Sequence, residues 1–222
     1  MSEWWTYHLS DFLLFSARTY YRLFEIYNAA IWPAQILALA LGIGILVLLR
    51  RGPATSKWIS WTLAAGWIWT AVAFLKLRYA TINWSAAYFA WAFGIEGLAL
   101  LLIGGSALTF ERPRDLAGRI GLATYAFALL VLPFAAALPG REWRGAQLFL
   151  LCPDPTAIGT FGLLLCARAR HRWLLMIVPV LWCLYSGFFL LAMKSPDWWI
   201  APLLAGLAVV FSSVSPVTSK TR

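Results

Sequence analysis

Apolar runs of membrane-spanning length dominate this sequence, and short clusters of basic residues lie between several of them. A helix needs about 20 apolar residues to cross about 30 Å of hydrocarbon. Seven runs approach that length, at approximately residues 29–49, 58–77, 84–107, 119–138, 146–167, 173–193 and 198–215. The pattern predicts an all-α fold, a polytopic helical membrane bundle with about seven transmembrane helices.

The composition excludes a soluble domain of this size. Hydrophobic residues make up 62% of the 222 residues and charged residues only 12%, about half the charged share of a soluble domain. A soluble fold of this length could not cover so much apolar surface. The net charge of +9 does not indicate nucleic-acid binding, because the basic residues are dispersed between the runs rather than gathered on one surface. We therefore expect the lipid bilayer, and not a nucleic acid, as a partner.

The basic residues also predict an orientation. The segments on one side of the predicted membrane contain 11 Lys and Arg, and those on the other side contain 7. Cytoplasmic loops carry the excess of basic residues. This count predicts an N-terminus outside the cell and a cytoplasmic C-terminus. No cleavable signal peptide is expected, since Glu3 stands where a basic cluster would precede the apolar core.

The chain divides into an N-terminal amphipathic segment (1–28), the transmembrane bundle (29–216) and a polar tail (217–222). On a helical wheel of residues 10–27, Asp11, Arg18, Arg22 and Glu25 form one stripe, opposite Leu13, Ala17, Tyr20, Phe24 and Tyr27. Such a helix can lie in the membrane interface with its aromatic side in lipid. It can equally pack as a lid on the ends of the bundle, and the sequence leaves both open.

Two acidic residues fall at membrane depth. Glu96 lies near the middle of the third run, and Asp154 lies in the fifth. Such residues are rare in spans, and they normally face a cavity, pair with another group or bind a proton. A neutral acid that hydrogen-bonds to a neighbouring helix is the structural alternative for Glu96. Lys76 is expected to extend to the headgroups, and a pairing with either acid is the less favoured alternative.

The segment Cys152-Pro153-Asp154-Pro155-Thr156 interrupts the fifth run. Two prolines remove two backbone donors, so a regular helix cannot easily continue through them. The freed carbonyls must then be buried in protein or line a wet cavity. A broken helix of this kind forms the ion site of several transporters. In the alternative, residues 146–154 form an outer loop, and a short helix capped by Asp154 starts after Pro155.

Histidine is absent from the seven runs, because His8 and His171 both lie outside them. Bis-histidine haem, an intramembrane zinc centre and a serine–histidine dyad all need histidine at depth. We therefore expect no enzyme activity, no cofactor and no metal. Pairs of small residues, including Ala40 with Gly44 and Gly159 with Gly162, predict close helix packing.

Two stretches carry a resemblance to a known family. They are WWTYHLSDFLLFSARTYYRLFEIYNAAIWPAQ, from Trp4 to Gln35, and CPDPTAIGTFGLLL, from Cys152 to Leu165. The chain resembles the bacterial multi-pass membrane family of unknown function DUF6064, over nearly its whole length. The resemblance implies a bacterial inner-membrane protein with several spans, and it implies no activity, cofactor or catalytic residue.

Together these features favour a small transporter or channel for a proton, a cation or a small solute. Its candidate site is a broken fifth span together with a mid-membrane acid: Glu96, Cys152, Pro153, Asp154, Pro155 and Thr156. The alternative is a non-catalytic accessory or scaffold subunit of a membrane complex, in which polar groups only hold helices together. That alternative implies a membrane partner subunit, whereas transport implies an ion or small solute as the ligand.

Overall fold

The computed structural model describes residues 13–137, 141–169 and 172–214, and this part of the chain is almost entirely helical. The α-helices are α1 (Ala17–Ala30), α2 (Ala34–Arg51), α3 (Ser56–Trp69), α4 (Ala86–Ala99), α5 (Gly105–Ala107), α6 (Leu116–Ala126), α7 (Pro153–Leu165), α8 (Ile177–Ala192) and α9 (Ile200–Val214). Strands β1 (Thr109–Phe110) and β2 (Ala167–Arg168) pair antiparallel. The 3₁₀ segments are η3 (Pro53–Thr55), η5 (Tyr79–Thr81), η8 (Leu132–Ala137), η9 (Trp143–Gly145) and η10 (Arg172–Met176). The π segments are η4 (Thr70–Lys76), η6 (Leu100–Gly104) and η7 (Phe127–Val131), and they extend α3, α4 and α6.

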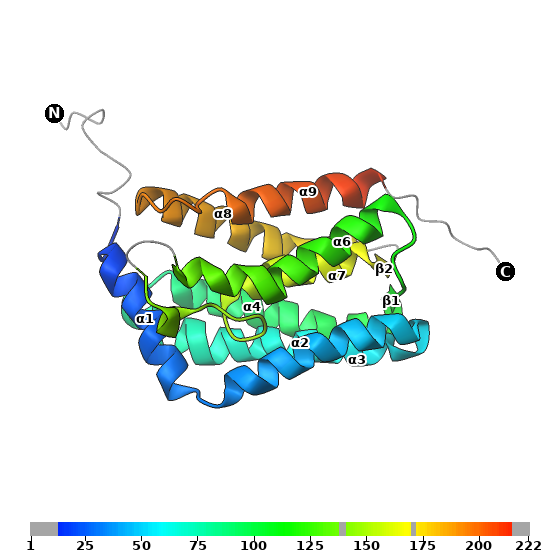
Figure 1. Ribbon diagram of the computed structural model, residues 1–222, viewed down its shortest axis with the longest axis horizontal. Coiled ribbons are helices and arrows are strands. Elements are labelled where there is room, and N and C mark those ends of the chain that lie inside the picture. The colour runs from blue at the N-terminus through cyan, green and yellow to red at the C-terminus, as the bar shows by residue number, and fades with distance from the viewer. Residues whose placement is uncertain (1–12, 138–140, 170–171, 215–222) are drawn as a thin grey trace.

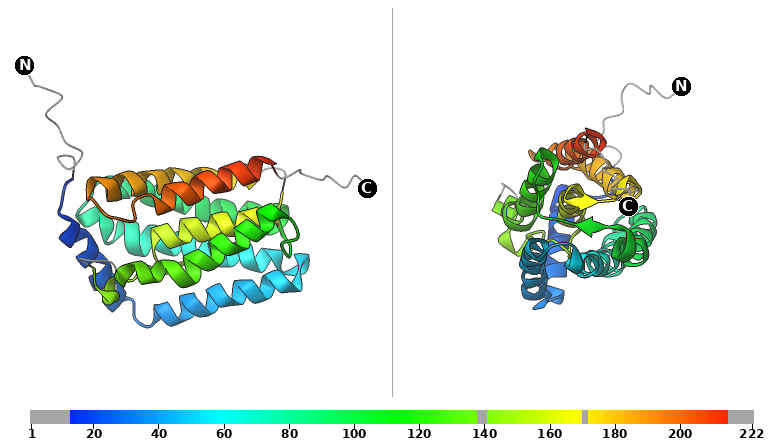
Figure 2. Two further views of the ribbon diagram at one scale, coloured as in Figure 1. Left: turned by 45° about the horizontal axis from the view of Figure 1, so that its top comes forward. Right: turned by 90° about the vertical axis from the view of Figure 1, so that its right-hand side faces the viewer.

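The long helices run side by side as a bundle with two distinct ends (Figure 1). Helix α1 crosses one end, which we call the α1 end, and the β1–β2 pair closes the other, the strand end. The connections 77–85, 141–152 and 193–199 belong to the α1 end. The end-on view in Figure 2 shows the helices arranged around a centre.

Five helical segments among the described residues are long and apolar enough to cross a membrane. They are Ala34–Arg51, Pro53–Thr81, Ala86–Ala107, Leu116–Ala135 and Arg172–Ala192. The expectation of about seven spans is therefore not confirmed. The two remaining runs give α7, with 13 residues, and α9, with 15. Both are shorter than the roughly 20 residues that a perpendicular crossing needs.

Helix α7 occupies the centre of the bundle. All of its 13 residues are buried, and it contacts α3, α6, α8 and α9. The prediction that 146–167 forms one long apolar span is wrong, because residues 146–152 are not helical. The non-helical stretch nevertheless reaches into the bundle, where a Cβ on Gly66 would lie 3.1 Å from the Leu150 Cα. Gly66 is ten residues into α3 from the strand end, a rise of about 15 Å.

The two prolines stand where a helix tolerates them. Pro153 and Pro155 fall in the first turn of α7, and Cys152 is the N-cap. The first four N–H groups of a helix have no intrahelical partner, so these prolines remove no helical hydrogen bond. The expected interruption is thus the start of a helix at Pro153 rather than a break within one. The alternative of a short helix is closer to the structure, although the helix starts before Pro155 and the preceding stretch is not an outer loop.

The carbonyls before α7 are satisfied by side chains from neighbouring helices. Thr70 Oγ1 donates to the Leu150 carbonyl at 3.3 Å, and Tyr27 Oη donates to the Leu151 carbonyl at 2.9 Å. Non-helical backbone at membrane depth requires such partners. Of the two environments expected for the carbonyls before the prolines, burial in protein or a wet cavity, the Leu150 and Leu151 carbonyls have the first.

Helix α1 packs as a lid rather than with its aromatic side in lipid. It begins at Ala17, with Ser16 Oγ accepting from the Thr19 N–H, and residues 13–16 are not helical. Its buried side chains are Tyr20, Leu23, Phe24 and Tyr27. The three aromatic rings of this face contact Phe74, Tyr79 and Phe189 of the bundle. The predicted aromatic face is therefore confirmed at three positions; Asp11 lies outside the described residues.

Gly162 lies at a close crossing of α6 and α7 and gives a first prediction. A Cβ on Gly162 would lie 2.5 Å from the Gly121 carbonyl oxygen and 2.6 Å from the Tyr125 nitrogen. Gly162→Ala therefore forces α6 and α7 apart, and we expect it to cost about 1–3 kcal/mol of stability. Thermal unfolding in detergent measures the change. Gly44→Ala is the control, because nothing lies within 4 Å of a Cβ at Gly44, and an equal loss in both variants would contradict the close crossing.

Candidate functional site

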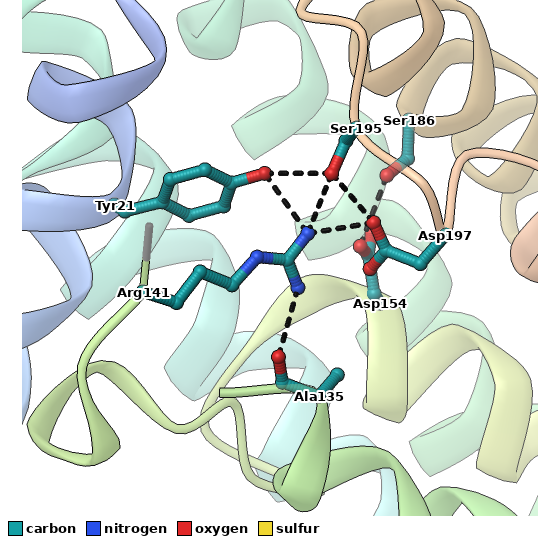
Figure 3. A network of polar contacts seen from close by, with 7 residues as sticks. All are labelled: Tyr21, Ala135, Arg141, Asp154, Ser186, Ser195 and Asp197. Atoms are coloured by element: carbon teal, nitrogen blue, oxygen red, sulfur yellow. Dashed lines mark hydrogen bonds and ion pairs between the residues drawn. The ribbon is translucent and has the colours of Figure 1, made fainter. Parts of the chain in front are cut away.

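Arg141 is the centre of a polar cluster at the α1 end (Figure 3). Three oxygens share the two N–H groups of its Nη2 atom: Asp197 Oδ1 at 2.6 Å, Ser195 Oγ at 2.7 Å and Tyr21 Oη at 2.9 Å. The guanidinium also lies over the Tyr21 ring, 4.4 Å from its centroid. Ser195 in turn donates to Asp197 Oδ1 at 2.6 Å. We call Arg141, Asp197, Ser195 and Tyr21 the Arg141 cluster.

The Arg141 cluster joins three segments that are distant in sequence. Tyr21 comes from α1, Arg141 from the connection between α6 and α7, and Asp197 from the connection between α8 and α9. The side chains of Arg141 and Asp197 are only 8% and 11% exposed. Burial alone lowers the pKa of Arg141, but its hydrogen bonds and charge interaction with Asp197 and Tyr21 raise the pKa above its ordinary value. Arg141 is therefore a buried, permanent cation.

Asp154 lies directly beyond this cluster, in the first turn of α7. Both of its carboxyl oxygens accept hydrogen bonds from α8, Oδ1 from Trp182 Nε1 at 2.7 Å and Oδ2 from Ser186 Oγ at 3.0 Å. Ser186 is six residues from the end of α8, so Asp154 lies about 9 Å below the α1 end. Asp154 interacts electrostatically with both Asp197 and Arg141.

A small polar cavity connects Asp154 to the Arg141 cluster. Its volume is about 30 Å³, enough for about two water molecules. Besides apolar groups, it is lined by Tyr21, Arg141, Glu142, Gln147, Asp154 and Asp197. Three carboxyl groups and one guanidinium therefore line the cavity, and the guanidinium is paired with the carboxylate of Asp197.

The other residues predicted around Asp154 have structural environments. Cys152 is fully buried, and its backbone N–H donates to the Leu148 carbonyl at 2.9 Å. Thr156 is fully buried too, and its hydroxyl has no hydrogen-bond partner in the described part of the chain. Pro153 and Pro155 shape the first turn of α7 but do not line the cavity. Of the predicted segment, Asp154 alone reaches the cavity among the described residues.

Glu96 is buried as predicted but does not join this cavity. It is 3% exposed, and its Oε1 atom has no hydrogen-bond partner among the described residues. It lies ten residues into α4, about 15 Å from the helix start. The cavity that Asp154 lines does not include it. Lys76 is exposed, and no ion pair links it to either acid in the described part of the chain.

Arg141 and Asp197 are not among the site residues that the sequence predicts. Both lie in connections, and a charge in a connection is ordinarily solvated. The two residues have opposite charges and lie in two connections on the same predicted side of the membrane, which is the one sign in the sequence that they could pair. Hydrophobic periodicity does not show which connections contact each other. No group of three or more His, Cys, Asp or Glu residues in the described ranges could hold a metal ion.

Comparison with known proteins gives a family but no activity. A family model described as a family of unknown function, DUF6064, matches residues 17–218. No curated protein and no solved structure matches the chain. The matched range contains α1, the central helix α7 and every residue of the Arg141 cluster. The match extends over most of the sequence, and the chain therefore belongs to the DUF6064 family.

Proposed function

We propose that this chain is a small multi-pass membrane transporter or channel for protons or a small monovalent cation. The observation that carries the proposal is a carboxyl group, Asp154, at the base of a polar cavity deep in an apolar bundle. Ionisable residues at membrane depth typically mark ion or proton pathways. The short, fully buried α7 that presents Asp154 after a non-helical stretch is the kind of element that transporters use at such sites.

The charge and size of the cavity support a small cation rather than an organic solute. Among the described residues that line it, Asp154, Asp197 and Glu142 carry carboxyl groups and Arg141 is the one cation. This balance attracts positive charge and repels anions. A volume of about 30 Å³ admits water, a proton or a small ion, and it is far below the several hundred Å³ of an organic ligand site.

The Arg141 cluster supplies a means of controlling access. Arg141 and Asp197 come from two connections at the α1 end, form an ion pair with each other (Figure 3), and both line the cavity. Separation of this ion pair would release the Asp197 carboxylate next to Asp154 and widen the opening. In this mechanism Arg141 neutralises Asp197 in the closed state, and the transported cation takes the place of Arg141 beside Asp197 in the open state. The proposal includes an inner-membrane location with the α1 end outside, and no catalytic role.

Proton flux into liposomes tests the role of Asp154. The full chain is reconstituted into vesicles that contain a pH-sensitive dye, and flux is driven by a potassium or pH gradient. We expect Asp154→Asn to reduce flux at least tenfold, because the amide cannot exchange a proton yet keeps an acceptor oxygen for α8. Sodium and potassium flux are measured in the same vesicles.

Asp115→Asn is the matched control. Asp115 caps α6 at the strand end, where its side chain accepts from the Gly118 N–H, and Asn caps helices about as well as Asp. We expect this variant to transport like the unaltered chain. Flux that does not differ from empty vesicles, or that is the same in Asp154→Asn and the unaltered chain, would exclude the proposal.

A second candidate function is that of an accessory subunit. It is favoured by the lipid-facing sides of α2 and α4, where Gly44 and Gly94 have no atom within 4 Å of an added Cβ. Small residues on such faces allow another helix to approach closely. This candidate requires a membrane partner at fixed stoichiometry when the chain is purified under mild conditions. A purified chain that transports without a partner favours the first proposal.

A further inference from the structure

A second pocket lies on the outside of the α1 lid, away from the cavity at Asp154. It is a groove of about 450 Å³ between α1 and the segment that follows η4. Arg18 and Arg22 line it from α1, and Arg78 lines it from the opposite side. None of the described residues that line it is acidic. We call it the arginine groove.

The arginine groove concentrates positive charge that the described protein neutralises only in part. Arg22 forms an ion pair with Glu25 at 2.7 Å, but its side chain is 67% exposed. Neither Arg18 nor Arg78 forms an ion pair with any described residue. Arginine presents its N–H donors in a planar fork that matches the oxygens of phosphate. Three such forks around one groove form a site suited to a phosphate group.

The apolar side chains in the same groove point to the source of that phosphate. Leu77 and Ile26 line the groove and are 60% and 48% exposed. Leu77 directly follows Lys76, the last residue of η4, so the groove lies where the second candidate span ends. A free phosphate ion makes no use of an apolar wall. A phospholipid does, because its glycerol and upper acyl chains continue from the phosphate into the hydrocarbon layer.

We propose that the arginine groove binds the headgroup of an anionic phospholipid, with the phosphate between Arg18, Arg22 and Arg78 and the glycerol against Leu77 and Ile26. This inference depends on membrane insertion but not on transport through the cavity at Asp154. Bound lipid would hold α1 against the end of the bundle, since Arg18 and Arg22 belong to the lid and Arg78 to the bundle.

Lipid retention measured by native mass spectrometry tests the proposal. The full chain in detergent is titrated with phosphatidylglycerol and, separately, with phosphatidylcholine of the same acyl chains. We expect the unaltered chain to prefer phosphatidylglycerol about tenfold or more. Each basic residue near an anionic lipid contributes about fivefold, so Arg18→Gln/Arg22→Gln/Arg78→Gln should remove the preference. The single variant Arg78→Gln is used if the triple variant does not fold. We expect it to reduce the preference for phosphatidylglycerol about fivefold.

The control neutralises three arginines at the strand end, in Arg50→Gln/Arg51→Gln/Arg114→Gln. These three side chains are exposed, as are those of Arg18 and Arg22, and we expect this variant to keep the preference for phosphatidylglycerol. An equal loss in both triple variants, or an unaltered chain that does not distinguish the two lipids, would overturn the proposal. In a last experiment, inorganic phosphate is added as a competitor of the lipid. Complete displacement of the lipid by millimolar phosphate would assign the groove to a free anion and also overturn it.

Discussion

Replacement of Arg141 by Met is expected to lower the free energy of unfolding by about 3–5 kcal/mol. The change leaves Asp197 with a nearly buried carboxylate and no cation, next to Asp154. Breaking one partner of a buried ion pair costs this much because the remaining charge stays desolvated and unpaired. Asp197→Leu should be destabilising for the same reason, since it strands the Arg141 guanidinium. Unfolding in detergent followed by tryptophan fluorescence measures both.

The double variant Arg141→Met/Asp197→Leu separates this effect from simple loss of packing. We expect it to be more stable than either single variant, because no buried charge is left unpaired. Arg168 and Glu111 provide the control pair, with an N–O distance of 3.1 Å and side chains that are 62% and 33% exposed. Removing either control residue should cost no more than about 1 kcal/mol. Additive losses at Arg141 and Asp197 would show that the pair is not coupled.

The helix positions could be read from the sequence because each depends on a local property. Runs of apolar residues mark α2, α3, α4, α6 and α8, and alternation of polar and aromatic residues marks the buried face of α1. The environment of that face could not be read in the same way. Tyr20, Phe24 and Tyr27 present an apolar surface that suits lipid and protein equally well, and only the approach of Phe74 and Tyr79 decides between them.

The fifth run shows a limit of a different kind. The two prolines predicted an interruption near residue 153, and the structure has a helix start there. The depth of that start depends on Gly66, which lets Leu150 approach α3. A contact between residues 84 positions apart leaves no periodic signal in either segment. The length of the apolar run therefore predicts a full membrane-spanning helix, whereas the segment is helical over only 13 residues.

The candidate site was predictable at its buried end and not at its opening. Asp154 could be predicted because it costs free energy to place a carboxyl group within an apolar membrane-spanning run. Its partners Trp182 and Ser186 lie on α8, where an aromatic residue and a serine are ordinary. Arg141 and Asp197 gain their significance only from the meeting of two connections, which is decided by how α7, α8 and α9 pack.

Glu96 is a buried acid whose replacement should have the second large effect on stability. Its Oε1 atom is buried with no hydrogen-bond partner among the described residues. The neighbouring turn of α4 packs on apolar α3, where a Cβ on Gly97 would touch Ile68. An unsatisfied buried polar group costs about 1–3 kcal/mol. Met is apolar and has about the same side-chain length as Glu. Glu96→Met should therefore stabilise the protein by about that amount.

A stabilising substitution at this position becomes informative when stability and flux are measured together. A residue retained at a cost to stability is typical of functional sites. If Glu96 exchanges protons along the path from Asp154, Glu96→Met raises the unfolding midpoint and lowers proton flux, and Glu96→Gln lowers flux with a smaller gain in stability. A loss of stability in Glu96→Met would instead mean that the carboxyl is hydrogen-bonded and structural. Unchanged flux in both variants would confine the proton path to Asp154 and the Arg141 cluster.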